Sequence, residues 1–237
     1  MRGFLARLRR RLRGVELSPD PQQRLDTWQA QTKEDLRRPF SEARYVVVDV
    51  ESTGLDLQKD RLIAIGAVAV VDGRIELAQS FEVVLRQDQS SSRENILIHG
   101  ISGEVQREGH PPAEALLDFL EFLGNSPLVA FHVAFDRTMI VRALRDHLGL
   151  RFKHPWLDLA YVMPGLLPQW RHKYRALDDW TGHFEIGNFA RHSALADALA
   201  TAQLFLVALS LAKGAHSEHY HALQELEQSY RWTMQQG

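Results

Sequence analysis

The chain has 237 residues, 45% of them hydrophobic, which is enough to build the core of one large α/β domain with terminal extensions. Its formal net charge of −2 indicates no broad basic surface for nucleic acid, so any polyanion must bind locally. The sequence contains no cysteine, which excludes disulfides, thiolate zinc sites and a cysteine nucleophile and leaves histidine and carboxylates as the strong metal ligands.

Residues 1–14 are basic, with six arginines, no acid and apolar residues at helical spacing. They lack the long apolar stretch of a signal peptide or membrane span, and we therefore expect a cytoplasmic protein. Three interpretations are open: a disordered basic tail, a helix or arm that contacts a membrane surface or nucleic acid, and an organelle transit peptide. Residues 15–43 complete this first region as a short helix, anchored by Trp28, and a linker.

A run of β-branched residues at 45–48 predicts a strand buried on both faces, and it ends in Asp49 and Glu51. Because strand side chains alternate, the two carboxylates share a face, about 6–7 Å apart along the chain. Protonation, cationic side chains or a metal ion can neutralise such a pair, and two hard oxygen ligands suit Mg²⁺ or Mn²⁺. The alternative is a solvated strand end that runs into a turn at residues 52–54.

Two further strand-like runs, residues 61–71 and 75–85, are joined at Asp72-Gly73, a dipeptide typical of β-hairpins. The first three strands are therefore expected to be antiparallel. The elements predicted after them are a helix over 111–124, a strand over 127–135, a helix over 136–149, and helical segments at 156–168, 176–184, 193–212 and 219–234. This order predicts an α/β fold with a mixed sheet flanked by helices.

The two C-terminal segments each allow two interpretations. Residues 194–212 are an apolar stretch of 19 residues, close to the length of a membrane span, but the polar residues within it and its many alanines favour a buried core helix. The segment 219–234 has one apolar face, which either packs on the domain or docks a partner. The residues of that face recur at steps of three and four: Tyr220, Leu223, Leu226 and Tyr230.

Three more residues are candidates for chemistry. Asp136 follows the fourth strand at a strand-to-helix junction, where α/β sheets place ligand-binding groups and where an aspartate is also an ordinary helix N-cap. Asp197 lies in the first turns of a helix that begins after Ser193, and a carboxylate on a core helix needs a partner. His192, in the loop before that helix, either folds back over the same site or is a surface histidine.

These residues, in this order, resemble the DEDDh (DnaQ-like) family of 3′→5′ exonucleases, and most closely the proofreading epsilon subunit of bacterial DNA polymerase III. Three motifs carry the resemblance: "DVESTGLD" at 49–56, "AFHVAFD" at 130–136 and "HSALAD" at 192–197. The segment "ILIHGIS" at 96–102 is similar to the family segment that contacts the terminal nucleotide. The match covers about residues 44–213.

The resemblance implies an RNase H-like fold for residues 44–213. Residues 214–237, outside the resemblance, are expected to form a C-terminal helix because of their apolar pattern. The resemblance also implies two divalent ions, Mg²⁺ or Mn²⁺, about 4 Å apart. The implied metal ligands are Asp49, Glu51, Asp136 and Asp197, with Asp49 shared between the ions, and His192 is the implied general base. Implied substrate-binding residues are Ser52, Thr53, Gly54, Leu55, His99, His132 and Phe135. The chain has Phe131-His132 where the family usually has His-Asn, which changes a polar group near the second motif.

The implied activity is hydrolysis of DNA from single-stranded or frayed 3′ ends to 5′-mononucleotides, in proofreading or repair, with a DNA polymerase as a further partner left open. Two alternatives are kept. One is a 3′→5′ exoribonuclease on RNA or short oligoribonucleotides, because the catalytic motifs do not read the 2′-hydroxyl. The other is a non-catalytic, polymerase-associated binding module, against which the complete set of metal and base residues argues.

Overall fold

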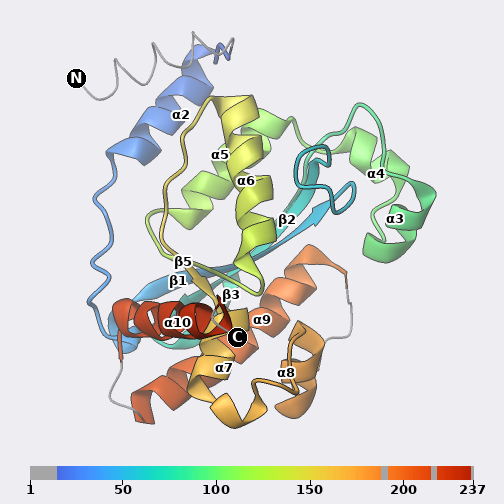
Figure 1. The fold of residues 1–237 in the computed structure, drawn as a ribbon. Helices are drawn as coiled ribbons and strands as arrows, with labels where there is room; N and C mark the ends of the chain where they lie inside the picture. The colour runs from blue at the N-terminus through green and yellow to red at the C-terminus, as the bar shows by residue number, and fades with distance from the viewer. Residues whose placement is uncertain (1–14, 188–191, 215–217, 236–237) are drawn as a thin grey trace.

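The computed structural model describes residues 15–187, 192–214 and 218–235 (Figure 1). Residues 1–14, for which we predict contact with a membrane surface or nucleic acid as one alternative, lie outside the described residues. Within the described part of the chain, one sheet of five strands forms the centre of the molecule, in the order β3-β2-β1-β4-β5.

The sheet is mixed, as predicted. Its strands are β1 (Arg44–Ser52), β2 (Leu62–Val71), β3 (Arg74–Val84), β4 (Leu128–Ala130) and β5 (Trp156–Asp158). The first three pair antiparallel, while β4 pairs parallel with β1 and β5 parallel with β4. The predicted hairpin turn joins β2 to β3, with positive φ at both Asp72 (52°) and Gly73 (73°), as a tight two-residue turn requires.

Two predicted boundaries are wrong. The fourth strand ends at Ala130 rather than continuing to residue 135, because His132 takes a left-handed conformation with φ of 63° and a helix begins at the next residue. The segment 156–168, predicted as helical, opens with strand β5 and becomes a helix only at Leu159. Both errors fall in short apolar runs, where periodicity does not distinguish a buried strand from a helix.

Helices cover both faces of the sheet (Figure 1). The α-helices of the described residues are α2 (Pro19–Ala30), α3 (Arg93–His99), α4 (Gly103–Glu108), α5 (Pro112–Leu123), α6 (Val133–Leu148), α7 (Leu159–Leu166), α8 (Leu177–His183), α9 (Ala194–Gly214) and α10 (Tyr220–Gln235). Short 3₁₀ turns lie at Phe40–Glu42 and Pro168–Trp170. One core joins the sheet to α2, α5 and α6, and a second joins it to α7, α8, α9 and α10.

The alternation of β1 assigns its side chains to these two cores. Val46, Val48 and Val50 lie in the core with α5 and α6, whereas Tyr45 and Val47 lie in the core with α9. Asp49 and Glu51 continue the second series by strand alternation, so they point to the face that α9 covers. The fold thus places the two acids of the first motif on the side from which the third motif approaches.

Both ends of the described chain are part of the same packed unit. On α2, Leu25 is fully buried and the indole N–H of Trp28 donates to the carbonyl of Gly124 at 2.9 Å, as expected for an anchored helix. On α10, Tyr220 and Leu223 are buried in the core that contains α7, so this helix packs on the domain. Of the two interpretations of residues 219–234, packing on the domain is confirmed.

Helix α9 is the core helix that the sequence favoured. Its segment Ala194–Lys213 is long and apolar enough to cross a membrane by length and composition, a test that the buried helix of a domain also passes. Its side chains Ala202, Phe205 and Ala208 are completely buried in the core they share with Tyr45 and Val47. The apolar character of α9 is therefore accounted for by contact with the sheet.

Candidate active site

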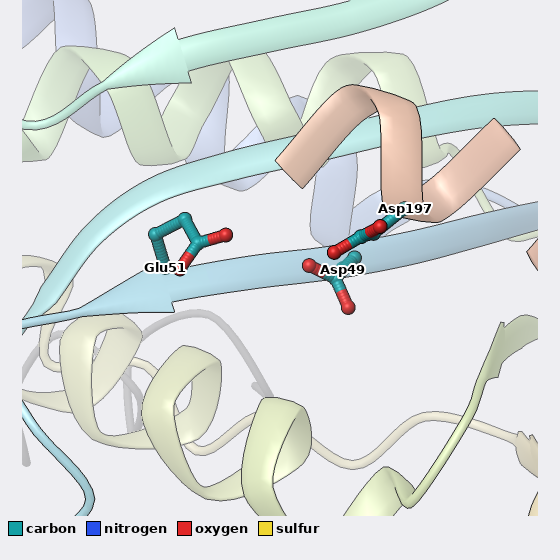
Figure 2. Close-up of side chains that lie close together, drawn as sticks. All are labelled: Asp49, Glu51 and Asp197. Atoms are coloured by element: carbon teal, nitrogen blue, oxygen red, sulfur yellow. The ribbon is translucent and has the colours of Figure 1, made fainter. Parts of the chain in front are cut away.

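Three carboxylates from two elements meet at the end of β1. Asp49 and Glu51 extend from β1, Asp197 extends from the first turns of α9, and one carboxylate oxygen of each lies within 4.8 Å of those of the other two. Figure 2 shows the carboxylates of Asp49 and Asp197 side by side, with Glu51 farther along the strand. The predicted proximity of the first and third motifs is therefore confirmed in the geometry of the chain.

The close approach of α9 to β1 depends on a glycine of β2. Gly66 pairs in register with Asp49, and a Cβ at this position would lie 2.1 Å from the backbone nitrogen of Leu195. The backbone of β2 and the first turn of α9 are thus in contact with no side chain between them. This contact brings Asp197, which is only 5% exposed, to the carboxylates of β1.

His192 contributes its backbone to this site. Its amide N–H donates to Oδ2 of Asp197 at 3.1 Å, from a left-handed conformation with φ of 63°. The imidazole is exposed. The prediction that His192 lies in the loop and Asp197 on the helix is confirmed, and the role of the ring as general base stays a prediction.

Asp136 lies near the end of β1, close to Glu51 and to the backbone of Val50. It occupies the first turn of α6 and is only 4% exposed, while His132 is the N-cap residue, so the alternative of an ordinary aspartate cap is wrong. Burial raises the pKa of Asp136 well above its ordinary value of 3.8, and the negative charges of Asp158 and Glu51 add to that increase. Hydrogen bonding to the backbone of Val50 opposes it.

The donor set fits hard divalent cations. Every candidate ligand is a carboxylate, and Mg²⁺ and Mn²⁺ prefer oxygen ligands. Asp49, Glu51 and Asp197 each place one oxygen within 4.8 Å of the others, and like charges this close are unfavourable unless a proton or a cation compensates them. The concentration of negative charge at the end of β1 therefore provides an energetic reason for a cation to bind here.

The turn after β1 is held by its own polar groups. The hydroxyl of Ser52 donates to the carbonyl of Gly54 at 2.6 Å, and the hydroxyl of Thr53 donates to Oδ1 of Asp60 at 2.7 Å. A Cβ on Gly54 would lie 2.5 Å from the Asp60 carboxylate, so a larger residue there would displace this carboxylate from the turn. The turn in this way presents Leu55, which is 86% exposed.

Helix α3 is tied to the same end of β1. The side-chain amide of Asn95 donates to the carbonyl of Ser52 at 2.6 Å. Leu97 and Ile98 of this helix are 77% and 56% exposed. The exposed apolar side chains of α3 and of the turn after β1 therefore belong to two segments joined by this hydrogen bond.

His99 is held inside the α3–α4 segment rather than presented at the surface. It is 5% exposed, Nδ1 accepts from the amide of Ile101 at 3.0 Å, and Nε2 lies 3.2 Å from the Ser91 hydroxyl. Burial lowers the pKa of His99. These contacts describe a histidine that shapes the segment, and its predicted contact with the terminal nucleotide stays a prediction.

The two remaining predicted substrate residues lie at the start of α6. The ring of His132 is exposed and meets Phe131 edge-on, with ring centroids 4.9 Å apart. Phe135 is partly buried against the core that contains α5 and α6. Their predicted contacts with substrate stay predictions.

Residues that the sequence analysis missed also shape the site. Gly66 had a readable signal, since a glycine within a strand of branched residues often marks a close backbone approach. Asp60 orders the turn after β1, and Asp158, 1% exposed at the end of β5, accepts the backbone N–H of His132 at 3.0 Å. No sequence motif identifies these two partners, because Asp60 lies seven residues from Thr53 and Asp158 lies 26 residues from His132.

Comparisons with known proteins agree with this geometry. The family model RNase_T, described as Exonuclease, matches residues 46–205. The PolC-type DNA polymerase III of Thermotoga petrophila is 31% identical over 194 residues, or 82% of this chain and 14% of the relative. The corresponding protein of Bacillus subtilis is 30% identical over 189 residues, or 79% of this chain and 13% of the relative. The chain therefore spans about one seventh of the length of these relatives.

Solved structures share the fold at low identity. Escherichia coli exonuclease I in complex with a dT13 oligonucleotide superimposes with a TM-score of 0.62 at 16% identity, covering 74% of this chain and 43% of that one. Exonuclease X in complex with 5′ overhanging duplex DNA gives a TM-score of 0.59 at 17% identity, covering 76% of this chain and 99% of that one. The predicted α/β fold, an RNase H-like mixed sheet flanked by helices, is confirmed.

Proposed function

The chain belongs to the exonuclease family whose model matches residues 46–205, and on that premise we propose that it is a metal-dependent 3′→5′ exonuclease acting on DNA. The observation that supports this most directly is the group Asp49, Glu51 and Asp197, whose ligand oxygens lie within 4.8 Å. The PolC-type relatives support a setting in DNA proofreading or repair, and the solved complexes of related fold with DNA support DNA as the substrate.

The chain's own residues define how the site would work. Asp49, Glu51 and Asp197 would hold the divalent ions. Asp136, a buried carboxylate close to Glu51, would be a further ligand. Two such ions, when bound, supply electrostatic stabilisation to the attacking and leaving oxygens of a phosphodiester. The rigid pairing of β1 with β2 and the contact at Gly66 keep these ligands in place before substrate arrives.

His192 completes the reaction as general base. Its backbone holds Asp197 while its exposed ring is free to accept a proton from the attacking water. The water oxygen forms the new bond to phosphorus, the bond from phosphorus to the 3′ oxygen breaks, and that oxygen takes a proton from solvent. The products are a strand shortened by one nucleotide and a 5′-mononucleotide.

The exposed apolar side chains next to the site fit an unpaired 3′ end. Leu55, Leu97 and Ile98 are exposed on two segments that Asn95 joins at the end of β1. Unstacked bases expose their faces and gain from contact with apolar side chains, whereas paired bases are already stacked. We therefore propose that single-stranded or frayed ends are the preferred substrates.

The test compares three 5′-labelled substrates of one sequence: single-stranded DNA, duplex DNA with a mismatched 3′ end, and RNA, each with Mg²⁺ or Mn²⁺. We expect both DNA substrates to shorten from the 3′ end. Asp20 is an exposed acid on α2, and the control variant Asp20→Asn should shorten both substrates as wild type does. Preferential loss of the RNA would favour the exoribonuclease alternative. Binding of all three without shortening would favour the non-catalytic module.

A further inference from the structure

Arg231, on the C-terminal helix α10, bridges two carboxylates. Its Nη2 lies 2.7 Å from Oδ2 of Asp158, and its Nε lies 2.9 Å from Oε1 of Glu227. The guanidinium also stacks over the ring of Tyr161, 3.7 Å from its centroid. An arginine is suited to this position, because its planar fork reaches two carboxylates at once, which a lysine ammonium does not.

The two carboxylates are themselves linked. Oε2 of Glu227 accepts the backbone N–H of Asp158 at 3.0 Å, so α10 holds both the backbone and the side chain of the last residue of β5. Burial raises the pKa of Glu227, and the hydrogen bonds from Asp158 and Arg231 oppose that increase. Asp158 is 1% exposed, so its charge depends on this compensation.

Asp158 connects α10 to the start of α6. Its Oδ1 accepts the backbone N–H of His132 at 3.0 Å, in addition to that of Ala160 at 3.1 Å. His132 is the N-cap residue of α6 and has φ of 63°, a conformation that needs support from its surroundings. Asp136 lies on the first turn of the helix that starts there.

We propose that Arg231 is a positioning residue for the metal site, holding the start of α6, and with it Asp136, through Asp158 and the backbone of His132. This proposal rests on the proposed metal-dependent function. It assigns a role in that site to a helix that lies outside residues 46–205, the region that matches the family model. Loss of Arg231 would leave Asp158 uncompensated next to Asp136 and release the support of His132.

Another arginine provides a matched control. Arg24 on α2 pairs with Glu114, Asp118 and Glu121 of α5, at 2.6 to 2.9 Å, and so joins two helices that carry none of the candidate ligands. If Arg231 only fastened α10 to the domain, Arg231→Ala and Arg24→Ala should have the same kind of effect. If Arg231 positions Asp136, the two variants should differ in the binding of metal.

The experiment measures Mn²⁺ affinity without substrate, by electron paramagnetic resonance of free Mn²⁺, together with kcat, KM and melting temperature in the full chain. We expect Arg231→Ala to weaken Mn²⁺ binding by about 10- to 100-fold, as is usual when a group that orients a ligand is removed. Arg231→Lys, which keeps the charge but reaches only one carboxylate, should lie between that variant and wild type. Arg24→Ala should bind Mn²⁺ as wild type does, even where its melting temperature falls.

Equal Mn²⁺ affinity in Arg231→Ala and Arg24→Ala would overturn the proposal. If Arg231→Ala does not fold, the same comparison is made with Arg231→Lys, and equal affinity there overturns it as well. A wild-type chain that binds Mn²⁺ but shortens neither DNA nor RNA would contradict the proposed function, while the comparison of affinities would still decide the role of Arg231. A wild-type chain that binds no Mn²⁺ would overturn both.

Discussion

Gly66 on β2 lies directly opposite Asp49 on β1, and the first turn of α9 rests on the backbone of Gly66. A methyl group at this position would lie 2.1 Å from the backbone nitrogen of Leu195, too close for any packed structure. The helix would have to move away from the sheet and take Asp197 with it. One missing side chain on a neighbouring strand therefore sets the separation of two ligands from distant parts of the sequence.

Gly66→Ala is accordingly expected to lower kcat by roughly 100-fold, because displacements of about 1 Å in a catalytic constellation can cost that much. The melting temperature should fall too. Gly182→Ala is the matched control, since a Cβ on Gly182, in helix α8, meets nothing within 4 Å. Wild-type kinetics in Gly66→Ala would show that α9 does not depend on this contact.

His192→Asn separates the two functions of His192. Asparagine tolerates a positive φ, so the loop and the N–H contact with Asp197 should persist. We expect Mn²⁺ affinity to be unchanged and kcat to fall by about 10²- to 10⁴-fold, the usual contribution of general acid–base catalysis. Steady-state kinetics and direct metal titration measure the two effects, and a parallel loss of both would mean that the ring supports the site rather than the proton transfer.

Leu55→Ser tests the contact with the unpaired end. Because Leu55 is 86% exposed, the free energy of unfolding should change by no more than about 0.5 kcal/mol. Loss of an apolar contact with a base should raise KM for single-stranded DNA roughly 10-fold, the equivalent of about 1.4 kcal/mol. Leu77→Ser, at a leucine of β3 that is 66% exposed, is the control and should leave KM unchanged. Equal KM values for the two variants would remove Leu55 from the substrate contact.

Asp136→Asn should make the protein more stable when metal is chelated. The folded-state pKa of Asp136 is raised above 3.8, so the stability that its protonated form provides is complete below that pH and is lost as pH rises through the raised value. Asparagine stays neutral, so its advantage in melting temperature should grow as the pH rises from 3.8 through the raised folded-state pKa of Asp136. Thermal unfolding with a chelator measures this difference, which would be independent of pH if the charge of Asp136 were already compensated. Mn²⁺ should stabilise wild type more than the variant.

Much of the fold could be predicted because its signals are local. The β-branched run before Asp49, the turn at Asp72-Gly73 and the glycine after α5 each determine structure within a few residues, and the structure confirms all three. The placement of Asp49 and Glu51 on one face follows from strand alternation alone. The assignment of Asp136 and Asp197 to the same site rests instead on the resemblance to the DEDDh exonucleases, because local patterns do not show which distant acids meet.

The rest depends on contacts between distant segments. Strand β5 has three residues and is covered on both sides, so its composition resembles that of a buried helix. The early start of α6 follows from the left-handed conformation of His132, which Asp158 supports from another strand. The ion pair of Arg231 with Asp158 joins residues 73 positions apart, and no periodic pattern encodes such a pairing.

The most direct test of the central claim follows the shortening of one 5′-labelled single-stranded DNA over time, with Mg²⁺, for wild type and Asp197→Asn. The variant keeps the size of the side chain but removes the charge of one of the three clustered carboxylates. We predict a ladder that shortens one nucleotide at a time from the 3′ end in wild type, abolished by chelation and slowed by roughly 10³-fold or more in the variant, since a lost ligand charge costs several kcal/mol of transition-state stabilisation. Equal shortening by wild type and Asp197→Asn, or an intact strand with both, would contradict the account.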